Sequence, residues 1–442
     1  MKGKVYLESL GCAKNLVDSE VISGCLKESG YNFTISKEEA EIVIVNTCAF
    51  IKDAAEEAID TILSLAELKK KGACRRLVVA GCLPQRYGTQ LARELKEVDL
   101  FVGLGEFQKI AELLEGKRKE NSPPSLNVRA PTFLLDHTTP RIRATPSHTA
   151  YVKIAEGCSH HCSFCTIPRI KGPYQSRLPE SVVTEAMKLA EQGVKEINLI
   201  AQDTTFYGKD LTGKKDLALL LSQLSRINGI EWIRILYCHP DHFSKDLMEV
   251  IKEEEKICNY IDLPLQHISD RVMKRMGRGK DSSKVRKLIT EMRETIPQLW
   301  IRTSLIVGFP GETEDDFNLL MDFIKEIEFE HLGAFRYSNE EGTKAYRLQG
   351  KVSDEVIEER YHTLMSTQAA ISLKKNQRLV GSRQRVLVEG FSEEEVALLG
   401  RTAFQAPEID GIVYIDKGES APGEMVEVEI TGASEYDLFA EK

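Results

Sequence analysis

Residues 151–165 read YVKIAEGCSHHCSFC, a short apolar run followed almost at once by three cysteines in C-x3-C-x2-C spacing. These cysteines are Cys158, Cys162 and Cys165. The run 151–154 predicts a buried strand, and the loop after it brings three thiols close together. Structural zinc and an ordinary 4Fe-4S cluster each take four protein ligands. Three cysteines therefore predict a cluster with one open iron, whereas His160 or His161 as a fourth ligand would make a Cys3His zinc site.

The strand–helix alternation that starts here repeats about six times. The expected strands are YVKI (151–154), EINLIA (196–201), WIRILY (232–237), YIDLP (260–264), WIRTSLIVG (300–308) and HLGAFRYS (331–338). Six such units predict an open parallel (βα)6 barrel over residues 149–375, with its active groups at the carboxyl ends of the strands.

Upstream, short β-branched runs alternate with helical segments in the same way. They are VYLESLG (5–11), EIVIVNT (41–47), RLVVAG (76–81) and DLFVG (99–103). Such runs, separated by helices, predict a doubly wound parallel sheet over residues 1–117, covered on both faces.

A cysteine follows directly on each of the first three of these runs: Cys12, Cys48 and Cys82. Parallel strands end at one edge of their sheet, so neighbouring strands would bring the three thiols together where open α/β folds bind ligands. A small cysteine also packs well at a strand end, and this is the alternative. Three cysteines in three such places favour a second three-ligand site. The other four, Cys25, Cys74, Cys238 and Cys258, have neither spacing nor context and are interpreted as packing residues.

Two segments of different composition complete the chain. Residues 118–148 hold five of the fifteen prolines and predict an extended linker. Residues 376–442 contain about five short strands separated by Gly, Pro and Asp turns, which predict a small antiparallel β-barrel. This last segment has 14 acidic and 6 basic residues, so it carries -8 of the chain's net charge of -9.

The composition is that of a globular protein outside the membrane, with 42% hydrophobic and 29% charged residues. The sequence shows neither a leader's apolar core nor a run long enough to cross a bilayer, so we expect a cytoplasmic protein. In that reducing compartment, ten cysteines are unlike a disulfide framework.

The chain resembles the methylthiotransferase family of radical S-adenosylmethionine (SAM) enzymes over its whole length. The motifs are SLGCAKNLVDSE, VNTCAFI, AGCLPQRY, EGCSHHCSFCTIPRIKGPYQSR and IVGFPGET. The resemblance implies a methylthiotransferase N-terminal domain, a radical-SAM core and a C-terminal TRAM (OB-like) domain. It further implies two 4Fe-4S clusters, one on each cysteine triad, with SAM at the second and a reducing electron donor. The residues it suggests for contact with SAM are Phe164, Gln202, Asp203, Gly308 and Gly311.

The residues themselves leave simpler readings of these contacts open. Gly308 and Gly311 permit tight turns, and Thr313 with Asp316 resembles a helix capping box. Gln202 and Asp203 have the ordinary polarity of a loop after a strand. At the level of the whole protein, an electron-transfer or cluster-scaffold protein and a structural zinc protein are the other hypotheses.

Within the family, several stretches are most similar to members that methylthiolate the β-carbon of an aspartate in small-subunit ribosomal protein S-twelve. They are IPRIKGPYQSR, LIAQDTTFYG, IDLPLQH, YSNEEGTKAY and GRTAFQAPEIDG. The alternative substrate is an isopentenyl-adenosine of tRNA. An acidic C-terminal domain repels a phosphate backbone and attracts a basic ribosomal protein, which favours the protein substrate. Acidity can also merely confer solubility, and Arg378, Arg383 and Arg385 could form a local basic stripe.

Overall fold

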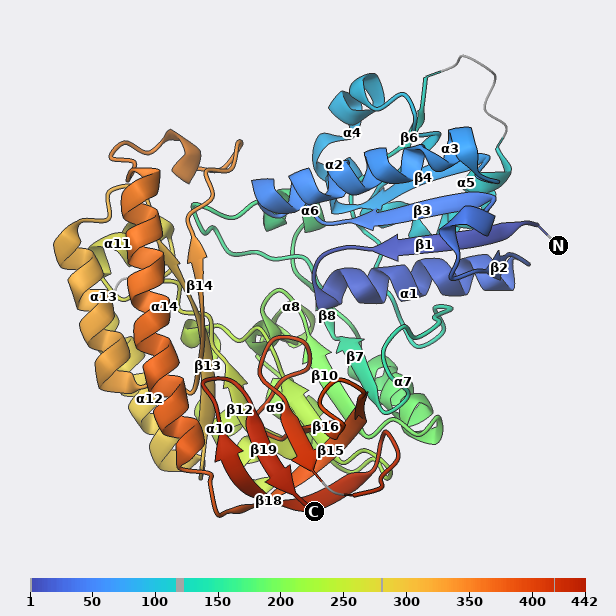
Figure 1. The fold of residues 1–442 in the computed structure, drawn as a ribbon. Helices are drawn as coiled ribbons and strands as arrows, with labels where there is room; N and C mark the ends of the chain where they lie inside the picture. Colours follow the sequence, from blue (N-terminus) through green and yellow to red (C-terminus); the bar gives the residue numbers. More distant parts are fainter. Residues whose placement is uncertain (1, 117–122, 280, 417) are drawn as a thin grey trace.

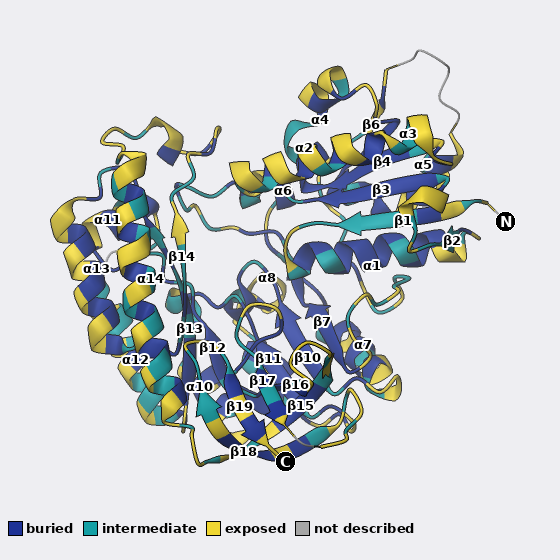
Figure 2. Cartoon of the chain, viewed as in Figure 1, coloured by how far each residue is buried: buried dark blue, intermediate teal, exposed yellow. Residues whose placement is uncertain are grey.

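The computed structural model describes residues 2–116, 123–279, 281–416 and 418–442. Figure 1 shows an N-terminal α/β unit above one end of an open barrel, and a small β-barrel packed at its other end. The strands are largely buried, and exposed residues gather on the outer sides of the helices (Figure 2). No helix in the described ranges is long and apolar enough to span a membrane.

The N-terminal sheet has six parallel strands in the order β2-β1-β3-β4-β5-β6. Its strands are β1 (Lys4–Ser9), β2 (Asn32–Phe33), β3 (Ile42–Thr47), β4 (Arg76–Gly81), β5 (Leu100–Val102) and β6 (Ser125–Asn127). Its helices are α1 (Ala13–Glu28), α2 (Lys52–Ala66), α3 (Leu68–Lys71), α4 (Cys82–Glu94) and α5 (Ile110–Glu115), with 3-10 turns η1 (Lys37–Glu39) and η2 (Leu104–Lys109). Figure 1 shows α1 on one side of the sheet and α2 and α4 on the other. Every residue of β3 is buried, as expected for a strand covered on both faces, and the doubly wound sheet is confirmed.

Part of the proline-rich segment expected to be a linker packs into the structure. Strand β6 (125–127) pairs with β5 and extends the N-terminal sheet. The Arg141 guanidinium contacts the carboxylates of Glu20 on α1 and Glu185 on α7 (Pro179–Glu191) at 2.5 and 2.6 Å. The segment therefore ties the N-terminal domain to the barrel. Residues 117–122 of the segment lie outside the described ranges.

The central sheet is an open barrel of six parallel strands in the order β14-β13-β12-β11-β10-β7, as expected. Its strands are β7 (Thr149–Lys153), β10 (Glu196–Ile200), β11 (Trp232–Ile235), β12 (Ile257–Asp262), β13 (Trp300–Val307) and β14 (His331–Arg336). Helices α7, α9 (Leu217–Leu224), α10 (Lys245–Glu253), α11 (Asp270–Met276), α12 (Ser282–Thr295), α13 (Glu314–Ile327) and α14 (Asp354–Gln377) follow the strands. Shorter elements are the two-stranded sheet β8 (Ala155–Glu156) and β9 (Gln175–Ser176), helices α6 (Ile167–Lys171) and α8 (Lys209–Thr212), and turns η3 (Thr204–Phe206), η4 (Pro240–His242) and η5 (Ala345–Arg347).

The C-terminal domain is a closed barrel in the order β15-β16-β17-β19-β18. Its strands are β15 (Arg383–Ser392), β16 (Ala397–Thr402), β17 (Val413–Asp416), β18 (Met425–Ala433) and β19 (Leu438–Glu441). Four pairings are antiparallel, as predicted, but β17 and β19 run parallel. An odd number of strands cannot alternate in direction all the way around a closed barrel, so one parallel pair is unavoidable.

The connection between β16 and β17 packs against the inner face of the open barrel at its amino-terminal end. The Phe404 ring stacks on Trp300 with the ring centroids 5.0 Å apart, and the Tyr260 hydroxyl donates to Asp410 at 2.7 Å. Trp300 is the first residue of β13. The C-terminal domain therefore covers the end of the barrel opposite to the one where the strands finish.

Candidate active site

The three N-terminal cysteines lie at one edge of the sheet. Cys12 follows β1 as the N-cap of α1, Cys48 directly follows β3, and Cys82 opens α4 after β4. Strands β1, β3 and β4 are adjacent, so their carboxyl ends lie side by side. Each thiol acts electrostatically on another of the group. The structure thus brings the dispersed cysteines together, and two of them stand at helix N-termini, which favour negative charge.

A glycine before Cys12 allows two of these loops to approach. Gly11 has φ +95°, a conformation that L side chains rarely adopt. A Cβ atom on Gly11 would lie 2.6 Å from Cβ of Cys48, a distance that real Cβ atoms essentially never show. Glycine is therefore required at position 11 both by the turn and by the close approach of Cys48.

The second triad lies in the loop that follows β8. Ser163, in the middle of the loop, donates its backbone N–H to Met276 at 2.7 Å and its hydroxyl to the carbonyl of Arg275 at 2.8 Å. These bonds fasten the loop to α11. Cys162 acts electrostatically on the thiols of both Cys158 and Cys165, and so does Arg278.

The thiols fit a metal cluster by their chemistry. Burial raises the pKa of Cys82 to about 12, that of Cys165 to about 12 and that of Cys158 to about 11. Burial acts in the same direction on Cys12, but Lys14 and the backbone N–H of Asn15 outweigh it and lower the pKa of that thiol. Thiols of raised pKa need a bound cation to be held as thiolates. Both sets of residues suit a cluster, and each leaves one ligand position open.

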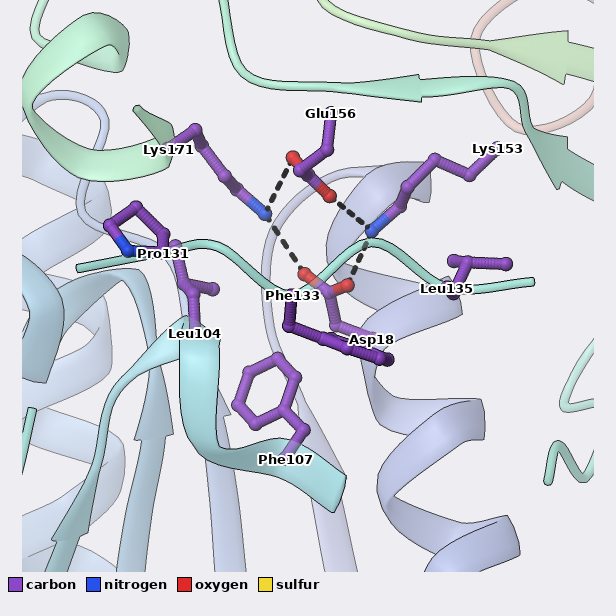
Figure 3. Close-up of a pocket in the computed structure, with 9 residues that line it drawn as sticks. All are labelled: Asp18, Leu104, Phe107, Pro131, Phe133, Leu135, Lys153, Glu156 and Lys171. Carbon is purple, nitrogen blue, oxygen red and sulfur yellow. Dashed lines mark hydrogen bonds and ion pairs between the residues drawn. The ribbon is translucent and has the colours of Figure 1, made fainter. Parts of the chain in front are cut away.

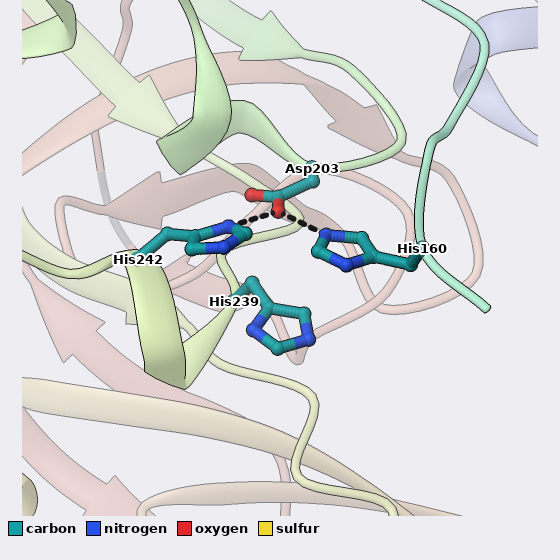
Figure 4. Close-up of side chains that lie close together, drawn as sticks. All are labelled: His160, Asp203, His239 and His242. Atoms are coloured by element: carbon teal, nitrogen blue, oxygen red, sulfur yellow. Dashed lines mark hydrogen bonds and ion pairs between the residues drawn. The ribbon is translucent and has the colours of Figure 1, made fainter. Parts of the chain in front are cut away.

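His160 belongs to the loop of the second triad, and its backbone N–H donates to Sγ of Cys158 at 3.5 Å, whereas its imidazole ring is hydrogen-bonded to Asp203. Its Nε2 lies 2.7 Å from a carboxylate oxygen of Asp203, and Nδ1 of His242 lies 2.6 Å from the same oxygen (Figure 4). Burial raises the pKa of Asp203, yet these hydrogen bonds hold it well below its usual range. His161 is exposed. The arrangement speaks against a Cys3His zinc site.

His160, Asp203, His239 and His242 form a group whose ligand atoms lie within 4.8 Å of one another. In the described part of the chain, the thiols of neither cysteine triad lie close enough together to hold a single ion in this way. The His160 ring stacks on His239 at 4.4 Å and 15° and on His242 at 5.0 Å and 23°. Imidazole binds a metal in its own plane, so stacked rings do not aim at one point. We interpret the group as a hydrogen-bonded support for Asp203.

The other residues suggested for contact with SAM lie around the second triad. Phe164 packs edge-on against Phe309, with the ring centroids 6.5 Å apart. Gly308 and Gly311 have φ +80° and +86°, and a Cβ on Gly308 would lie 2.3 Å from Ile357 of α14, so packing alone accounts for that glycine. Gln202 is half-buried directly after β10. The capping box of Thr313 and Asp316 at the start of α13 is confirmed.

The loops of both triads lie at the boundary between the N-terminal domain and the barrel. The hydroxyl of Thr166, next to Cys165, donates to the carbonyl of Phe50 at 3.1 Å, two residues after Cys48. Lys171, at the end of α6, acts electrostatically on all three thiols of the N-terminal triad. The two cysteine loops are therefore neighbours.

A buried network of four charges crosses the same boundary (Figure 3). Asp18 of α1 contacts the ammonium groups of Lys153 and, at 2.9 Å, of Lys171. Glu156 contacts the same two groups at 2.8 and 3.5 Å. Sequence reasoning missed this network, although lysine in the otherwise apolar run YVKI was a usable signal.

Lys14, two residues after Cys12, was also missed. Its ammonium lies 3.0 Å from the centroid of the Tyr237 ring, just beyond the end of β11. The residue is only 6% exposed. Burial lowers its pKa to about 8, partly offset by Cys12 and Asp262.

The remaining cysteines are buried and form no disulfide. Cys25 and Cys74 belong to the apolar core of the N-terminal domain, Cys238 to that of the barrel, and Cys258 to the cluster on its inner face. These surroundings agree with their interpretation as packing residues.

Three family profiles match successive parts of the chain. They are "Uncharacterized protein family UPF0004" at residues 4–103, the radical SAM superfamily at 152–324 and the TRAM domain at 380–442. The radical SAM methyltransferase TsrM of Kitasatospora setae has a similar fold, with a TM-score of 0.57 and 14% identity over 83% of this chain and 89% of that one. Together with the three-cysteine loop that follows β7 and β8, these matches define a radical SAM enzyme, a class that uses a 4Fe-4S cluster and SAM.

Relatives that match the chain over its full length identify the family within this class. A protein of Geobacter sulfurreducens named "Ribosomal protein uS12 methylthiotransferase RimO" is 51% identical over 442 residues, which cover 100% of this chain and 98% of the relative. A protein of Myxococcus xanthus with the same name is 48% identical over 99% of this chain and 91% of its own length. The chain belongs to the RimO family of methylthiotransferases.

Proposed function

We propose that this protein transfers a methylthio group to the β-carbon of an aspartate in ribosomal protein uS12. The observation that carries the proposal is the neighbourhood of two three-cysteine loops at one domain boundary, in a chain that is about half identical to full-length RimO relatives. One triad suits the formation of a substrate radical and the other the delivery of sulfur. An electron-transfer protein or a cluster scaffold would need neither the six-unit barrel nor the shared boundary.

The proposed cofactors are two 4Fe-4S clusters and SAM. Cys158, Cys162 and Cys165 would hold the cluster that chelates SAM, and Cys12, Cys48 and Cys82 the other. When bound, the first cluster and SAM supply, on reduction by an electron donor, a 5′-deoxyadenosyl radical that abstracts hydrogen from an unactivated carbon.

Residues of the chain would position SAM beside its cluster. Asp203, held ionised by two histidines, and the neighbouring Gln202 would face its amino-acid end. Phe164 would pack beside its adenine, with the turn at Gly308 and Gly311 near the nucleoside. The proposed domains are the methylthiotransferase N-terminal domain (1–117), the radical SAM core (149–375) and the TRAM domain (376–442), with the connecting segment 118–148 after the first.

The surface charge of the C-terminal domain supports a protein substrate. Exposed carboxylates occur all over this small barrel, and those on β18 and β19 are Glu427, Glu429 and Glu441. The opposing Arg385 on β15 is paired with Glu231 of the central domain at 2.8 Å, so it is less available to a phosphate. The acidic surface would steer a basic ribosomal protein and disfavour contact with nucleic acid through this domain. Action on a ribosomal protein also implies work in the cytoplasm.

Mass spectrometry of ribosomal proteins and tRNA tests the substrate, using cells that lack the enzyme and cells that express it. We expect a methylthio mass increase on an aspartate of uS12 that depends on the enzyme. Enzyme-dependent methylthiolation of isopentenyl-adenosine in tRNA, with uS12 unchanged, would refute the proposal in favour of the tRNA enzyme.

Alanine variants of each cysteine triad test the division of labour. Changing Cys158, Cys162 and Cys165 together should abolish the formation of 5′-deoxyadenosine. Changing Cys12, Cys48 and Cys82 together should leave 5′-deoxyadenosine formation measurable while sulfur insertion stops. Anaerobic iron and sulfide analysis should show that each variant loses about half of the iron; zinc without iron in the wild type would rule out both clusters.

A further inference from the structure

Lys14 differs from the other buried lysines of the domain boundary in having no acidic partner in ion-pair contact. Lys153 and Lys171 each contact two carboxylates. Among the described residues, no carboxylate lies within 4.0 Å of the Lys14 ammonium, and no hydrogen bond to it is formed. An ammonium buried to this extent is costly unless an anion or polar groups compensate it.

Cys12 and Asp262 act electrostatically on this ammonium, and in the described structure its close contact is the face of the Tyr237 ring. A cation–π contact holds a cation without using its N–H donors, so the three donors of Lys14 remain available to a ligand. The ring is held in place by an uncommon backbone conformation, with φ of 61° at Tyr237. The carboxylate of Asp262 accepts the Tyr237 N–H at 2.9 Å, and the carbonyl of Tyr237 accepts the Thr204 N–H at 3.0 Å. Strain kept by such bonds is typical of functional sites.

The charged groups around Lys14 are already engaged. Asp262 accepts the Tyr237 N–H, and Glu156 contacts both Lys153 and Lys171. Arg302, across the barrel, has its Nε 3.7 Å from a carboxylate oxygen of Asp410. The arrangement therefore leaves one cation without a carboxylate in ion-pair contact, beside Cys12 and above the carboxyl end of the barrel.

We propose that Lys14 binds the side-chain carboxylate of the target aspartate in the substrate protein. The inference rests on the proposed function, and it assigns to Lys14 the choice of a carboxylate-bearing residue. In aspartate the carboxylate carbon is bonded directly to the β-carbon, so a carboxylate held on Lys14 would bring that β-carbon to the neighbourhood of Cys12, whose thiol acts electrostatically on this ammonium. A neutral nucleobase offers no anion to this ammonium.

The test measures discrimination between two forms of the substrate on the anaerobic holoenzyme with SAM bound. The probes are purified uS12 and its variant with asparagine at the target position, and the readout is the dissociation constant of each. Loss of one charge-assisted hydrogen bond corresponds to roughly a tenfold to hundredfold weaker affinity. We expect the wild type to bind the aspartate form more tightly than the asparagine form by this factor. The control Lys27→Met, which removes an exposed lysine from the same helix, should show the same preference. Lys14→Met should bring the ratio of the two constants close to one, and Lys14→Arg should restore part of it.

Three outcomes would overturn the inference. In the first, the wild type binds the aspartate and asparagine forms equally. In the second, Lys14→Met binds both forms as the wild type does. In the third, Lys14→Met weakens the binding of both forms by the same factor, as loss of a structural role would do. A shift in the reduction potential of the N-terminal cluster in Lys14→Met, with the ratio unchanged, would assign Lys14 to the cluster instead. Failure of the proposed function is a separate result, in which the wild type binds and modifies tRNA but not uS12.

Discussion

Replacing Glu196 with glutamine should loosen the C-terminal domain from the barrel. Glu196, the first residue of β10, is fully buried and contacts Arg234 of β11 at 3.0 Å and Arg401 of β16 at 2.5 Å. Burial raises the pKa of Glu196, but the two guanidinium groups outweigh it and lower the pKa from 4.5 to about 2. At about 1.4 kcal/mol per pH unit, this difference corresponds to roughly 3 kcal/mol of stability at neutral pH. Breaking a buried ion pair costs a similar amount, about 3–5 kcal/mol.

Tryptophan fluorescence during urea unfolding measures this loss. The protein has two tryptophans, Trp232 and Trp300, and both lie in the apolar cluster that includes residues of the C-terminal domain. Glu196→Gln should lower the free energy of this transition at pH 7 by about 3–4 kcal/mol. Because the pKa is lowered in the folded state, the contribution of Glu196 is complete above pH 4.5 and disappears as the pH falls towards 2. The variant should lack this acid-dependent part.

The control is Glu358→Gln, which breaks the exposed pair with Arg336, whose side chains are 46% and 45% exposed. Exposed pairs contribute little, so the unfolding midpoint should stay unchanged. An unchanged midpoint in Glu196→Gln as well, or the same loss of stability between pH 4.5 and pH 2 in variant and wild type, would refute the reasoning.

Two further changes address the N-terminal domain. Gly11→Ala should lose about half of the bound iron, because its Cβ would collide with Cys48. The control Gly30→Ala has a similar φ of +88° but open space around the new Cβ, so it should keep the iron. Colorimetric iron analysis measures both. Equal iron in both variants would contradict the steric argument. Asp18→Asn leaves the ammonium groups of Lys153 and Lys171 facing Glu156 alone and should weaken domain docking by about 3–5 kcal/mol, seen as faster proteolysis between the domains; cleavage at the wild-type rate would contradict it.

Local patterns predicted the elements and the grouping of the cysteines. Each short apolar run at 41–47 and 76–81 became a buried strand, because hydrophobicity and β-branching act within a few residues. The dispersed cysteines could be grouped because parallel strands share an edge. That step required β1, β3 and β4 to be neighbours, which the sequence suggested only through the cysteines themselves.

The contacts between domains could not be predicted in this way. Lys14 owes its surroundings to Tyr237, more than two hundred residues later in the chain, and no periodicity connects the two. The loop after β16 has the composition of an exposed turn, yet Ala406 is fully buried against the barrel. Such placements depend on how finished domains dock, and a single sequence carries no local signal for docking.

Both docking contacts use buried ion pairs where apolar surface alone could have held the domains. Asp18 meets Lys153 and Lys171 on one side of the barrel, and Glu196 meets Arg401 on the other. Desolvation cancels much of the attraction in such pairs, so they are an inefficient source of stability. Their hydrogen bonds are directional, however, and therefore fix how two domains are oriented, which apolar contact does poorly. The proposed function requires two cysteine triads on different domains to act on one carbon, and an error of about 1 Å in such a geometry can cost roughly a hundredfold in rate. We infer that the charge network between α1 and the barrel is there to set the separation of the two triads.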